Sequence, residues 1–356
     1  MKTLLRLLLK TQHPPNRSGP AQTDKGMTLV ELLVGAIMAF LIITPMLGFV
    51  VDMLNTDRRE QVKSNTEQDL QAAVDFIAQD LSQAIYIYNG TEIDDIKTQL
   101  PAPPQNTTGT PILVFWKRQQ IKNAIPLSAG LKPSDCKLPG QTGGTIECND
   151  TYVRSLVAYY QIKETGSNPI WCQPSGGTCP TRIERYEIKD GVKNPYAPPT
   201  DPDFPYYAKT DTPKSSHKDE AFSTAFDFSE PTKKVTLITG GSPLVNSEVL
   251  VNYIDHSPKQ LDAAECQKAL GTPQTQRGLA GPTDVPEGTL RVTDSASSPP
   301  TNSFYACVDN ARNLARVTIR GNSLRRLQTN ADYDAKKAAY FPTASVQVQG
   351  LGARGN

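Results

Sequence analysis

The apolar residues of this chain are concentrated near its start, where they form one long uncharged run. Residues 32–51 (LLVGAIMAFLIITPMLGFVV) include sixteen apolar residues and no charged residue. Twenty helical residues extend about 30 Å, which matches the hydrocarbon thickness of a bilayer. Because the run is apolar on every side rather than along one face, it favours a membrane-spanning helix over a buried core helix.

After residue 51 the apolar positions fall on one face of a helix. They recur at helical spacings of three and four residues: Leu70, Val74, Ile77, Leu81 and Ile85. Polar residues fill the other sides: Asp69, Gln71, Asp75, Gln79, Asp80 and Gln83. The pair Asn89-Gly90 is of the kind that ends a helix. We therefore predict one helix from Met27 to Tyr88, about 60 residues long, with the apolar face of its second half against a sheet.

Pro45 lies inside this predicted helix. Proline has no backbone N–H to donate, so one helical hydrogen bond is lost and a kink or local unwinding is expected. The hydroxyl of Thr44 is a candidate to satisfy the freed backbone group.

The remaining chain, residues 89–356, has the pattern of an antiparallel β-rich region. Apolar runs, several with period two, predict strands at residues 112–116, 152–163, 182–189, 234–239, 248–254 and 314–320, with a weaker candidate at 345–348. Long proline-containing connections cover residues 91–110, 194–231 and 271–302. Loops of this length are typically functional or mobile, so we expect either partner contacts or tolerated insertions there. The predicted fold class is α+β, with a long helix packed on an antiparallel sheet.

The charges are as unevenly placed as the apolar residues. Residues 1–26 carry Lys2, Arg6, Lys10, Arg17 and Lys25 against a single acid, and the formal net charge of the whole chain is only +1. By the positive-inside rule this end stays in the cytoplasm and the chain after the helix is exported. The apolar run is not followed by an A-x-A-like cleavage site, so the helix is expected to remain in the mature protein. A near-neutral total argues against nucleic acid as a partner.

One carboxylate, that of Glu31, interrupts the start of the apolar segment. An acid in a membrane helix costs roughly 2.5–3.5 kcal/mol at the centre and less near the interface. We therefore expect Glu31 either to reach headgroup water or to pair with a positive charge at the same depth.

The residues around Glu31 resemble the processing motif of type IV prepilins. The motif is Lys25-Gly26-Met27-Thr28-Leu29-Val30-Glu31, followed by an uncharged apolar helix. The resemblance implies that a membrane prepilin peptidase cuts after Gly26 and methylates the new amine of Met27, which stands where Phe is commoner. It also implies that this amine pairs with Glu31 of a neighbouring subunit in a filament.

Further segments resemble a narrower group within that family. Residues 67–88 are similar to the second half of the helix in minor pilins of the PilW kind and in the J pseudopilins of type II secretion. With residues 341–350 (FPTASVQVQG), the chain is most similar to the cyanobacterial hormogonium polysaccharide secretion pseudopilins. The fold implied is type IV pilin-like, with four segments: a cleaved leader (1–26), a transmembrane half-helix (27–51), an amphipathic half-helix (52–88) and an exported β-rich head with long loops (89–356).

The function implied by this resemblance is that of a minor pseudopilin, a structural subunit and not an enzyme. It would belong to a type IV pilus-like filament that assists polysaccharide secretion and gliding motility. The implied partners are the prepilin peptidase, other major and minor pilins, the assembly platform with its ATPase, the exported polysaccharide, and membrane lipid before assembly. The implied location is the plasma (inner) membrane, crossed once with a cytoplasmic N-terminus and a periplasmic head, and then a cell-surface filament.

All six cysteines follow the apolar helix and are expected in an oxidising compartment: Cys136, Cys148, Cys172, Cys179, Cys266 and Cys307. An even count there indicates disulfides, for which fifteen pairings exist. The pairing of neighbours in sequence is preferred because the first four cysteines bound short loops rich in Gly, Pro and Thr. Each bridge is expected to contribute about 2–4 kcal/mol. Zinc is disfavoured, because the Cys172 to Cys179 spacing is not CxxC and no His lies nearby.

No catalytic signature or cofactor motif appears, since the chain has no GxSxG, HExxH or GxxxxGK[ST] sequence. We interpret four pairs as solvated surface: Asp94-Asp95, Glu184 with Glu187, Arg325-Arg326 and Lys336-Lys337. For the two basic pairs, the alternative interpretation is a contact with DNA or acidic polysaccharide. Two other functions stay open: a minor pilin for adhesion or DNA uptake or a type II secretion pseudopilin, and a membrane-anchored exported enzyme or sugar-binding domain.

Overall fold

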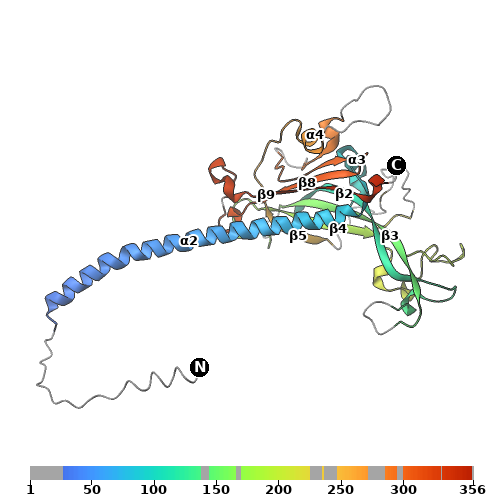
Figure 1. Cartoon of the computed structure of the whole chain (residues 1–356), viewed down its shortest axis with the longest axis horizontal. Helices are drawn as coiled ribbons and strands as arrows, with labels where there is room; N and C mark the ends of the chain where they lie inside the picture. The colour runs from blue at the N-terminus through green and yellow to red at the C-terminus, as the bar shows by residue number, and fades with distance from the viewer. Residues whose placement is uncertain are drawn as a thin grey trace, which may run out of the picture. The chain divides into compact units, whose positions relative to one another are not determined.

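The computed structural model describes residues 27–137, 144–165, 170–224, 235, 247–271, 285–294, 300–329 and 331–354 (Figure 1). The predicted leader with Gly26, and nearly all of the strand predicted at 234–239, lie outside the described residues. The chain divides into two compact units, Met1–Asp57 and Arg58–Asn356. The helix α2 (Leu29–Ser82) contributes to both.

The described part of the first unit is helical and carries no packed core. Every side chain from Met27 to Gln61 is exposed, including the whole apolar run at 32–51. By length and composition α2 is apolar enough to cross a membrane. The alternative interpretation, a buried core helix, has no support among these exposed side chains.

The kink or local unwinding predicted at Pro45 is not confirmed, because α2 continues through this residue without a break. Figure 1 draws the stretch as one continuous, gradually curved helix. The hydroxyl of Thr44 donates to the carbonyl of Phe40 over 2.8 Å. The carbonyl that loses its donor to Pro45 is that of Leu41, four residues before the proline, so Thr44 does not compensate for it.

The helix also ends earlier than predicted, at Ser82 instead of Tyr88. Residues 85–88 alternate Ile and Tyr, and such β-branched and aromatic residues favour a strand, β1 (Ala84–Ile87). Asn89 does not stop α2 but begins the helix α3 (Gly90–Ile96) with a capping box: its side chain accepts from the Glu92 N–H, and Glu92 accepts from the Asn89 N–H. The segment 91–110, predicted as a loop, is therefore partly helical.

Five antiparallel strands form the first sheet, in the order β1-β2-β3-β4-β5. The strands after β1 are β2 (Thr107–Pro126), β3 (Cys148–Glu164), β4 (Thr181–Lys189) and β5 (Glu248–Ile254). The predictions for these four are confirmed, although β2 is much longer than the five apolar residues that indicated it. Figure 1 shows β2 and β3 extending beyond their neighbours at one end.

Four further antiparallel strands form a second sheet, in the order β6-β7-β8-β9. Their bounds are β6 (Arg291–Val292), β7 (Phe304–Asp309), β8 (Leu314–Arg320) and β9 (Thr343–Gln349). The strands at 314–320 and 345–348 are confirmed, whereas β6 and β7 were not predicted. Two short helices, α4 (Glu265–Leu270) and α5 (Glu287–Leu290), precede this sheet. Among the described residues, an isolated antiparallel bridge pairs Ile254 of β5 with Gly321, the residue after β8.

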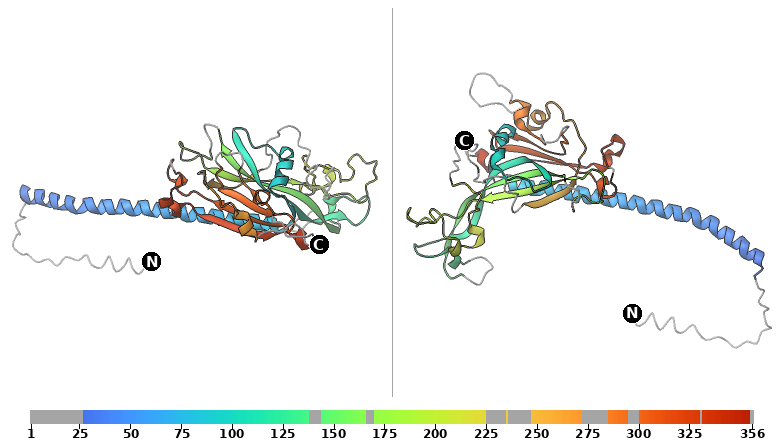
Figure 2. Two further views of the ribbon diagram at one scale, coloured as in Figure 1. Left: turned by 90° about the horizontal axis from the view of Figure 1, so that it is seen from above. Right: turned by 180° about the vertical axis from the view of Figure 1, so that it is seen from behind.

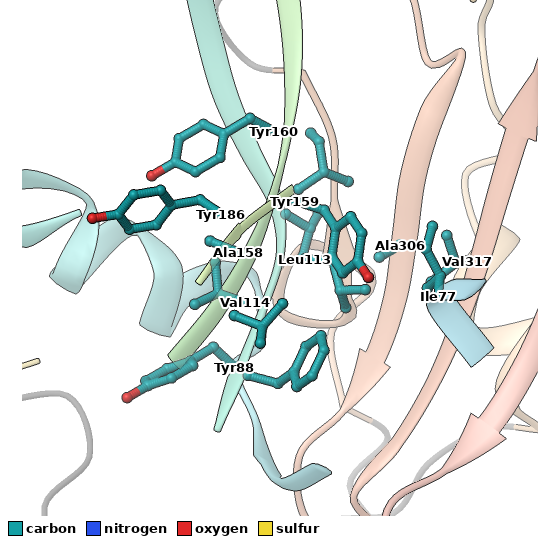
Figure 3. Packing of buried hydrophobic residues seen from close by; sticks show 14 of the residues in the cluster. Ile77, Tyr88, Leu113, Val114, Ala158, Tyr159, Tyr160, Tyr186, Ala306 and Val317 are labelled. Carbon is teal, nitrogen blue, oxygen red and sulfur yellow. The ribbon is translucent and has the colours of Figure 1, made fainter. Parts of the chain in front are cut away.

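The core of the second unit lies where the end of α2 meets both sheets. Leu70, Val74, Ile77 and Leu81 are buried in it, as the helical spacing predicted. In the close view, Ile77 lies beside Ala306 and Val317 of the second sheet, with the side chains of the first sheet beyond them (Figure 3). Figure 2 shows the second half of α2 running along the strands. The α+β class, with a long N-terminal helix on antiparallel sheets, is thus confirmed.

Candidate functional site

The start of α2 is organised by a reciprocal pair of hydrogen bonds between Thr28 and Glu31. The Glu31 N–H donates to the Thr28 hydroxyl over 3.3 Å, and the Thr28 N–H donates to Glu31 Oε2 over 3.3 Å. The Thr28 hydroxyl also donates to the same carboxylate oxygen over 3.2 Å. This is a capping box, which satisfies N–H groups that have no partner inside the helix.

Glu31 therefore has a partner that the sequence reasoning missed, namely the N-terminus of its own helix. The signal was present as T-x-x-E directly before an apolar run. A carboxylate there is also favoured by the positive end of the helix dipole. The Thr28 N–H and the Thr28 hydroxyl both donate to Oε2 of Glu31, so Oε1 is available to another donor. Met27, the predicted first residue of the mature chain, is exposed one residue before the box.

A second polar arrangement surrounds Asp80 in the last turn of α2. Its carboxylate accepts from Arg185 Nε over 2.7 Å, from the Tyr159 hydroxyl over 2.8 Å and from Lys117 Nζ over 3.1 Å. Glu187 completes the group, with Arg185 Nη2 at 2.7 Å and Lys117 Nζ at 3.3 Å from its two oxygens. The Lys117 contact with Glu187 is an ion pair by distance but lacks hydrogen-bond geometry. The group joins α2 to β2, β3 and β4.

Burial and charge act in opposite directions on the acids of this cluster. Burial alone would raise the pKa of Asp80, but the hydrogen bond from Arg185 and the charge of Lys117 outweigh it and hold that pKa below its usual value. The pKa of Glu187 is lowered in the same way, against burial, by Lys117 and Arg185. Burial and the Asp80 charge raise the pKa of Tyr159. The carboxylates are thus held ionised and the phenol neutral, so the cluster acts as a structural tie and offers no titratable acid near neutral pH.

Two predictions about surface acids are wrong here. Asp80 was placed on the polar side of its helix but is 7% exposed. Glu184 and Glu187 were interpreted as solvated, yet Glu184 is 3% exposed and accepts from Arg182 Nε over 2.6 Å. Buried carboxylates are retained where such cations meet them. The cations beside Asp80 come from β2 and β4, distant in sequence, whereas Arg182 lies two residues from Glu184 on the same strand. Asp94, predicted in a loop, lies in α3 and pairs with Lys97 on the surface.

All three predicted disulfides are present: Cys136–Cys148, Cys172–Cys179 and Cys266–Cys307. The third is buried in a small cluster with Leu270, Leu290 and Tyr305 and ties α4 to β7. The first lies beside the β2–β3 extension. The bridges thus hold the loops of the second unit, as the pairing of neighbours in sequence implied.

Arg325 is not a solvated cation, contrary to the prediction for the pair Arg325-Arg326. Its side chain is fully buried and reaches into the loop closed by Cys172–Cys179. There it donates to three backbone carbonyls, those of Pro174, Thr178 and Gly176, over 2.9, 2.9 and 3.0 Å. Burial lowers the pKa of this guanidinium. Arg326 pairs with Asp69 of α2. Of the four pairs predicted to be solvated, Asp94-Asp95 and Lys336-Lys337 are exposed as predicted.

Within the described ranges no group of three or more His, Cys, Asp or Glu side chains is placed to hold a metal ion. Comparison with protein-family models, with curated proteins and with solved structures identified no match. The candidate functional features of the described residues are therefore the start of α2, the cluster that ties α2 to the first sheet, and the surface of the second unit.

Proposed function

We propose that this chain is a minor pseudopilin, a structural subunit of a type IV pilus-like filament that assists polysaccharide secretion and gliding motility. The observation that carries the proposal is the start of α2. There, the sequence Gly26-Met27 precedes an exposed helix whose third residue is the acid Glu31 and whose next twenty residues, 32–51, carry no charge. A small residue before the helix suits backbone entry into a peptidase, and an uncharged run of this length suits a membrane.

The arrangement of charge supports one orientation for this subunit. Five basic residues precede Gly26, which favours a cytoplasmic N-terminus and an exported second unit. Cleavage after Gly26 removes these charges and leaves a cationic amine on Met27. That amine lies at the same depth as Glu31 of an adjacent helix, where Oε1 can accept from it while Oε2 keeps the capping box.

The second unit supports a structural role in such a filament. Its helix end is held to the first sheet by the Asp80 cluster, so forces on α2 are transmitted to the strands. Its loops are closed by three disulfides, which suits an oxidising exterior. The filament would be built by an assembly platform and its cytoplasmic ATPase, with the chain itself performing no chemistry.

Processing of the full chain tests the proposal. Co-expressed with a prepilin peptidase, the chain is expected to give an intact mass that begins at N-methylated Met27. Gly26→Leu is expected to block this cleavage, because the larger residue obstructs backbone entry. Gly19→Leu, a matched change within the leader, is expected to leave cleavage intact. A mature chain that begins at another residue would reject the pseudopilin proposal.

The specific machine is tested in cells. Deletion of the chain is expected to reduce polysaccharide export and gliding, and the full chain is expected to restore both, whereas Gly26→Leu is not. Normal export and gliding in the deletion strain would reject this role. A loss of DNA uptake or adhesion in their place would assign the chain to a different pilus of the same architecture.

A further inference from the structure

The bridge Cys172–Cys179 closes the shortest of the three disulfide loops, with a sequence separation of 7 against 12 and 41. Its two cysteines differ in their access to solvent. Cys172 is 5% exposed, whereas Cys179 is only half-buried, and residues 175–178 between them are exposed. A thiol that approaches from solvent therefore reaches Cys179 first.

A guanidinium lies against the sheltered sulfur of this bridge. Arg325 Nη2 is 3.5 Å from Cys172 Sγ, within the range of a hydrogen bond to sulfur. The same side chain donates to the carbonyls of Pro174, Gly176 and Thr178. The loop is thus wrapped around a cation, and these hydrogen bonds fix its position beside Cys172.

The charge of Arg325 has no anion beside it among the described residues. Its side chain is fully buried, and no described carboxylate bonds to it. Tyr253 is close enough to act on this charge, but a phenol is neutral near neutral pH. Carbonyl dipoles solvate the guanidinium in part, whereas buried charges are normally paired with an opposite charge. A negative charge on Cys172 Sγ would supply that pairing.

Opening the bridge creates such a charge, and solvent access and electrostatics select the same sulfur to carry it. In thiol–disulfide exchange a thiolate attacks one sulfur, and the other sulfur leaves with the electron pair. The reaction is faster when the leaving thiol is more acidic, and a neighbouring cation makes a thiol more acidic. Attack on the accessible Cys179 releases Cys172 as a thiolate directly beside Arg325.

The other two bridges lack this combination. Both Cys266 and Cys307 are buried in an apolar cluster, so neither sulfur is accessible. The remaining bridge has one sheltered and one accessible cysteine, with Cys136 1% exposed and Cys148 half-buried. Among the described residues, however, the cation that donates to a disulfide sulfur is Arg325, at the Cys172 bridge. Cys136–Cys148 is therefore a matched reference for the effect of the guanidinium.

We propose that Cys172–Cys179 is a site of thiol–disulfide exchange, and that its reaction partner is a dithiol, the cysteine pair of a thiol oxidoreductase. A thiolate of the dithiol attacks Cys179 Sγ, the S–S bond breaks, and its electron pair leaves on Cys172 Sγ. The second thiol of the dithiol then attacks the oxidoreductase sulfur of this mixed disulfide and releases Cys179. Two electrons pass to the bridge: the dithiol is oxidised to a disulfide, Cys172 remains a thiolate, Cys179 keeps one proton, and the other proton goes to solvent.

Arg325 allows this exchange to be reversed without loss of the fold. Its bonds to three loop carbonyls hold residues 174–178 when the bridge is open, so the two sulfurs stay close enough to be rejoined. The main apolar core of the second unit contains neither Cys172 nor Cys179. The exchange goes beyond the proposed function and does not rest on it, because it concerns the second unit alone.

Reduction of the full chain in lipid nanodiscs tests the site, with dithiothreitol and glutathione as probes. Limited dithiothreitol, followed by iodoacetamide and peptide mass analysis, is expected to open Cys172–Cys179 at least about tenfold faster than Cys136–Cys148. Glutathione has one thiol and cannot complete the second step. It is expected to be trapped on Cys179, with Cys172 alkylated.

Variants separate the electrostatic role of Arg325 from its support of the loop. In the reduced chain, the pH midpoint of Cys172 alkylation is expected to shift upward by about one unit or more in Arg325→Met. The shift is expected to be much smaller in Arg325→Lys, which keeps a cation. Arg326→Met, the matched change at the next residue, is expected to leave the midpoint unchanged. A loosened loop alone would change the rate of alkylation at every pH but not its midpoint.

Three outcomes overturn the proposal: opening of Cys136–Cys148 as fast as that of Cys172–Cys179, glutathione trapped on Cys172, or an unchanged pH midpoint in Arg325→Met. The first two are measured on the unaltered chain, so they decide the question even if the variants do not fold. Cleavage after Gly26 is measured by mass without any reductant. The exchange site and the proposed function therefore fail independently of each other.

Discussion

Asp80 and Arg185 form a bond of 2.7 Å that joins the last turn of α2 to the middle of the first sheet. The two residues are 105 positions apart, and each is about nine-tenths buried as a side chain. Arg185 also donates to Glu187 over 2.7 Å. Its guanidinium carbon lies 5.7 Å from the centroid of the Phe76 ring of α2. The helix is thus attached to the sheet by charge as well as by apolar packing.

The first prediction concerns the loss of this tie. Asp80→Ala leaves Lys117 and Arg185 buried without their main acid, and removing one partner of a buried pair costs about 3–5 kcal/mol. We expect a loss of that size in the free energy of unfolding, measured by denaturant titration with the fluorescence of the buried Trp116 as the probe. Asp75→Ala removes an exposed acid of the same helix and is expected to cost less than about 0.5 kcal/mol. Equal losses would contradict the role assigned to Asp80.

The second prediction follows from the lowered pKa values of Asp80 and Glu187. A group whose pKa is lower in the folded state stabilises the fold fully above its unfolded pKa of about 4 and loses that contribution as the pH falls through the folded value. The free energy of unfolding is therefore expected to decrease as the pH is lowered below about 4. Asp80→Asn should flatten this part of the pH profile. If the free energy of unfolding of Asp80→Asn falls with pH below about 4 as steeply as that of the unaltered chain, Asp80 does not contribute to the pH dependence of stability.

These buried charges mark the limit of what hydrophobic pattern can predict. Spacing placed Leu70, Val74, Ile77 and Leu81 correctly on the buried face, because helical periodicity alone decides which side they share. Asp80 lies on that face too, but its burial depends on Lys117 and Arg185, which the chain brings to it from β2 and β4. Only the folded chain brings these partners together, so the sequence pattern alone predicts that Asp80 faces solvent.

The same reasoning explains the errors at the end of the helix and in the second sheet. Ile85 fits both the helical spacing of the residues before it and the Ile–Tyr alternation of residues 85–88, and pairing with β2 favours the strand. The strand β7 (FYACVD) is buried on both faces, so it shows no alternation. The disulfides Cys136–Cys148 and Cys172–Cys179 were predictable because each closes a short loop, and Cys266 and Cys307 were the two cysteines that remained.

The third prediction compares two disulfides of different loop length. Cys266–Cys307 closes a separation of 41 residues and Cys136–Cys148 one of 12. The chain-entropy relation gives about 4 kcal/mol for the longer loop and about 3 kcal/mol for the shorter. Both Cys266 and Cys307 are also buried, so their replacement leaves a cavity. Double replacement by Ala should therefore lower the free energy of unfolding more for Cys266 and Cys307, and the reverse order would reject this account.

The fourth prediction concerns Arg325 as the support of the Cys172–Cys179 loop. Arg325→Met keeps much of the side-chain volume but leaves three carbonyls without a donor, and each unsatisfied buried group costs about 1–3 kcal/mol. We expect a loss of about 3 kcal/mol or more and faster amide hydrogen exchange in residues 173–178. Arg326→Met removes a partly exposed pair with Asp69 and should cost less than about 1 kcal/mol without affecting that loop. Unchanged amide hydrogen exchange of residues 173–178 in Arg325→Met would show that Arg325 does not support this loop.

The last prediction separates two roles of Glu31, the helix cap and the docking charge. Glu31→Gln keeps a side-chain oxygen that can accept from the Thr28 N–H but removes the negative charge, whereas Glu31→Ala removes both. If Glu31 only caps α2, Glu31→Gln should enter filaments like the unaltered chain, because the capping box survives the exchange. If the charge pairs with the amine of a neighbouring Met27, both variants should be cleaved after Gly26 and remain in the membrane, yet both should be lost from isolated filaments.

Thr28→Val is the matched control, since it removes the capping hydroxyl and keeps the charge. We expect Thr28→Val to assemble and both Glu31 variants to fail, as the proposed pairing requires. Assembly of Glu31→Gln at the unaltered level would assign Glu31 to the cap alone.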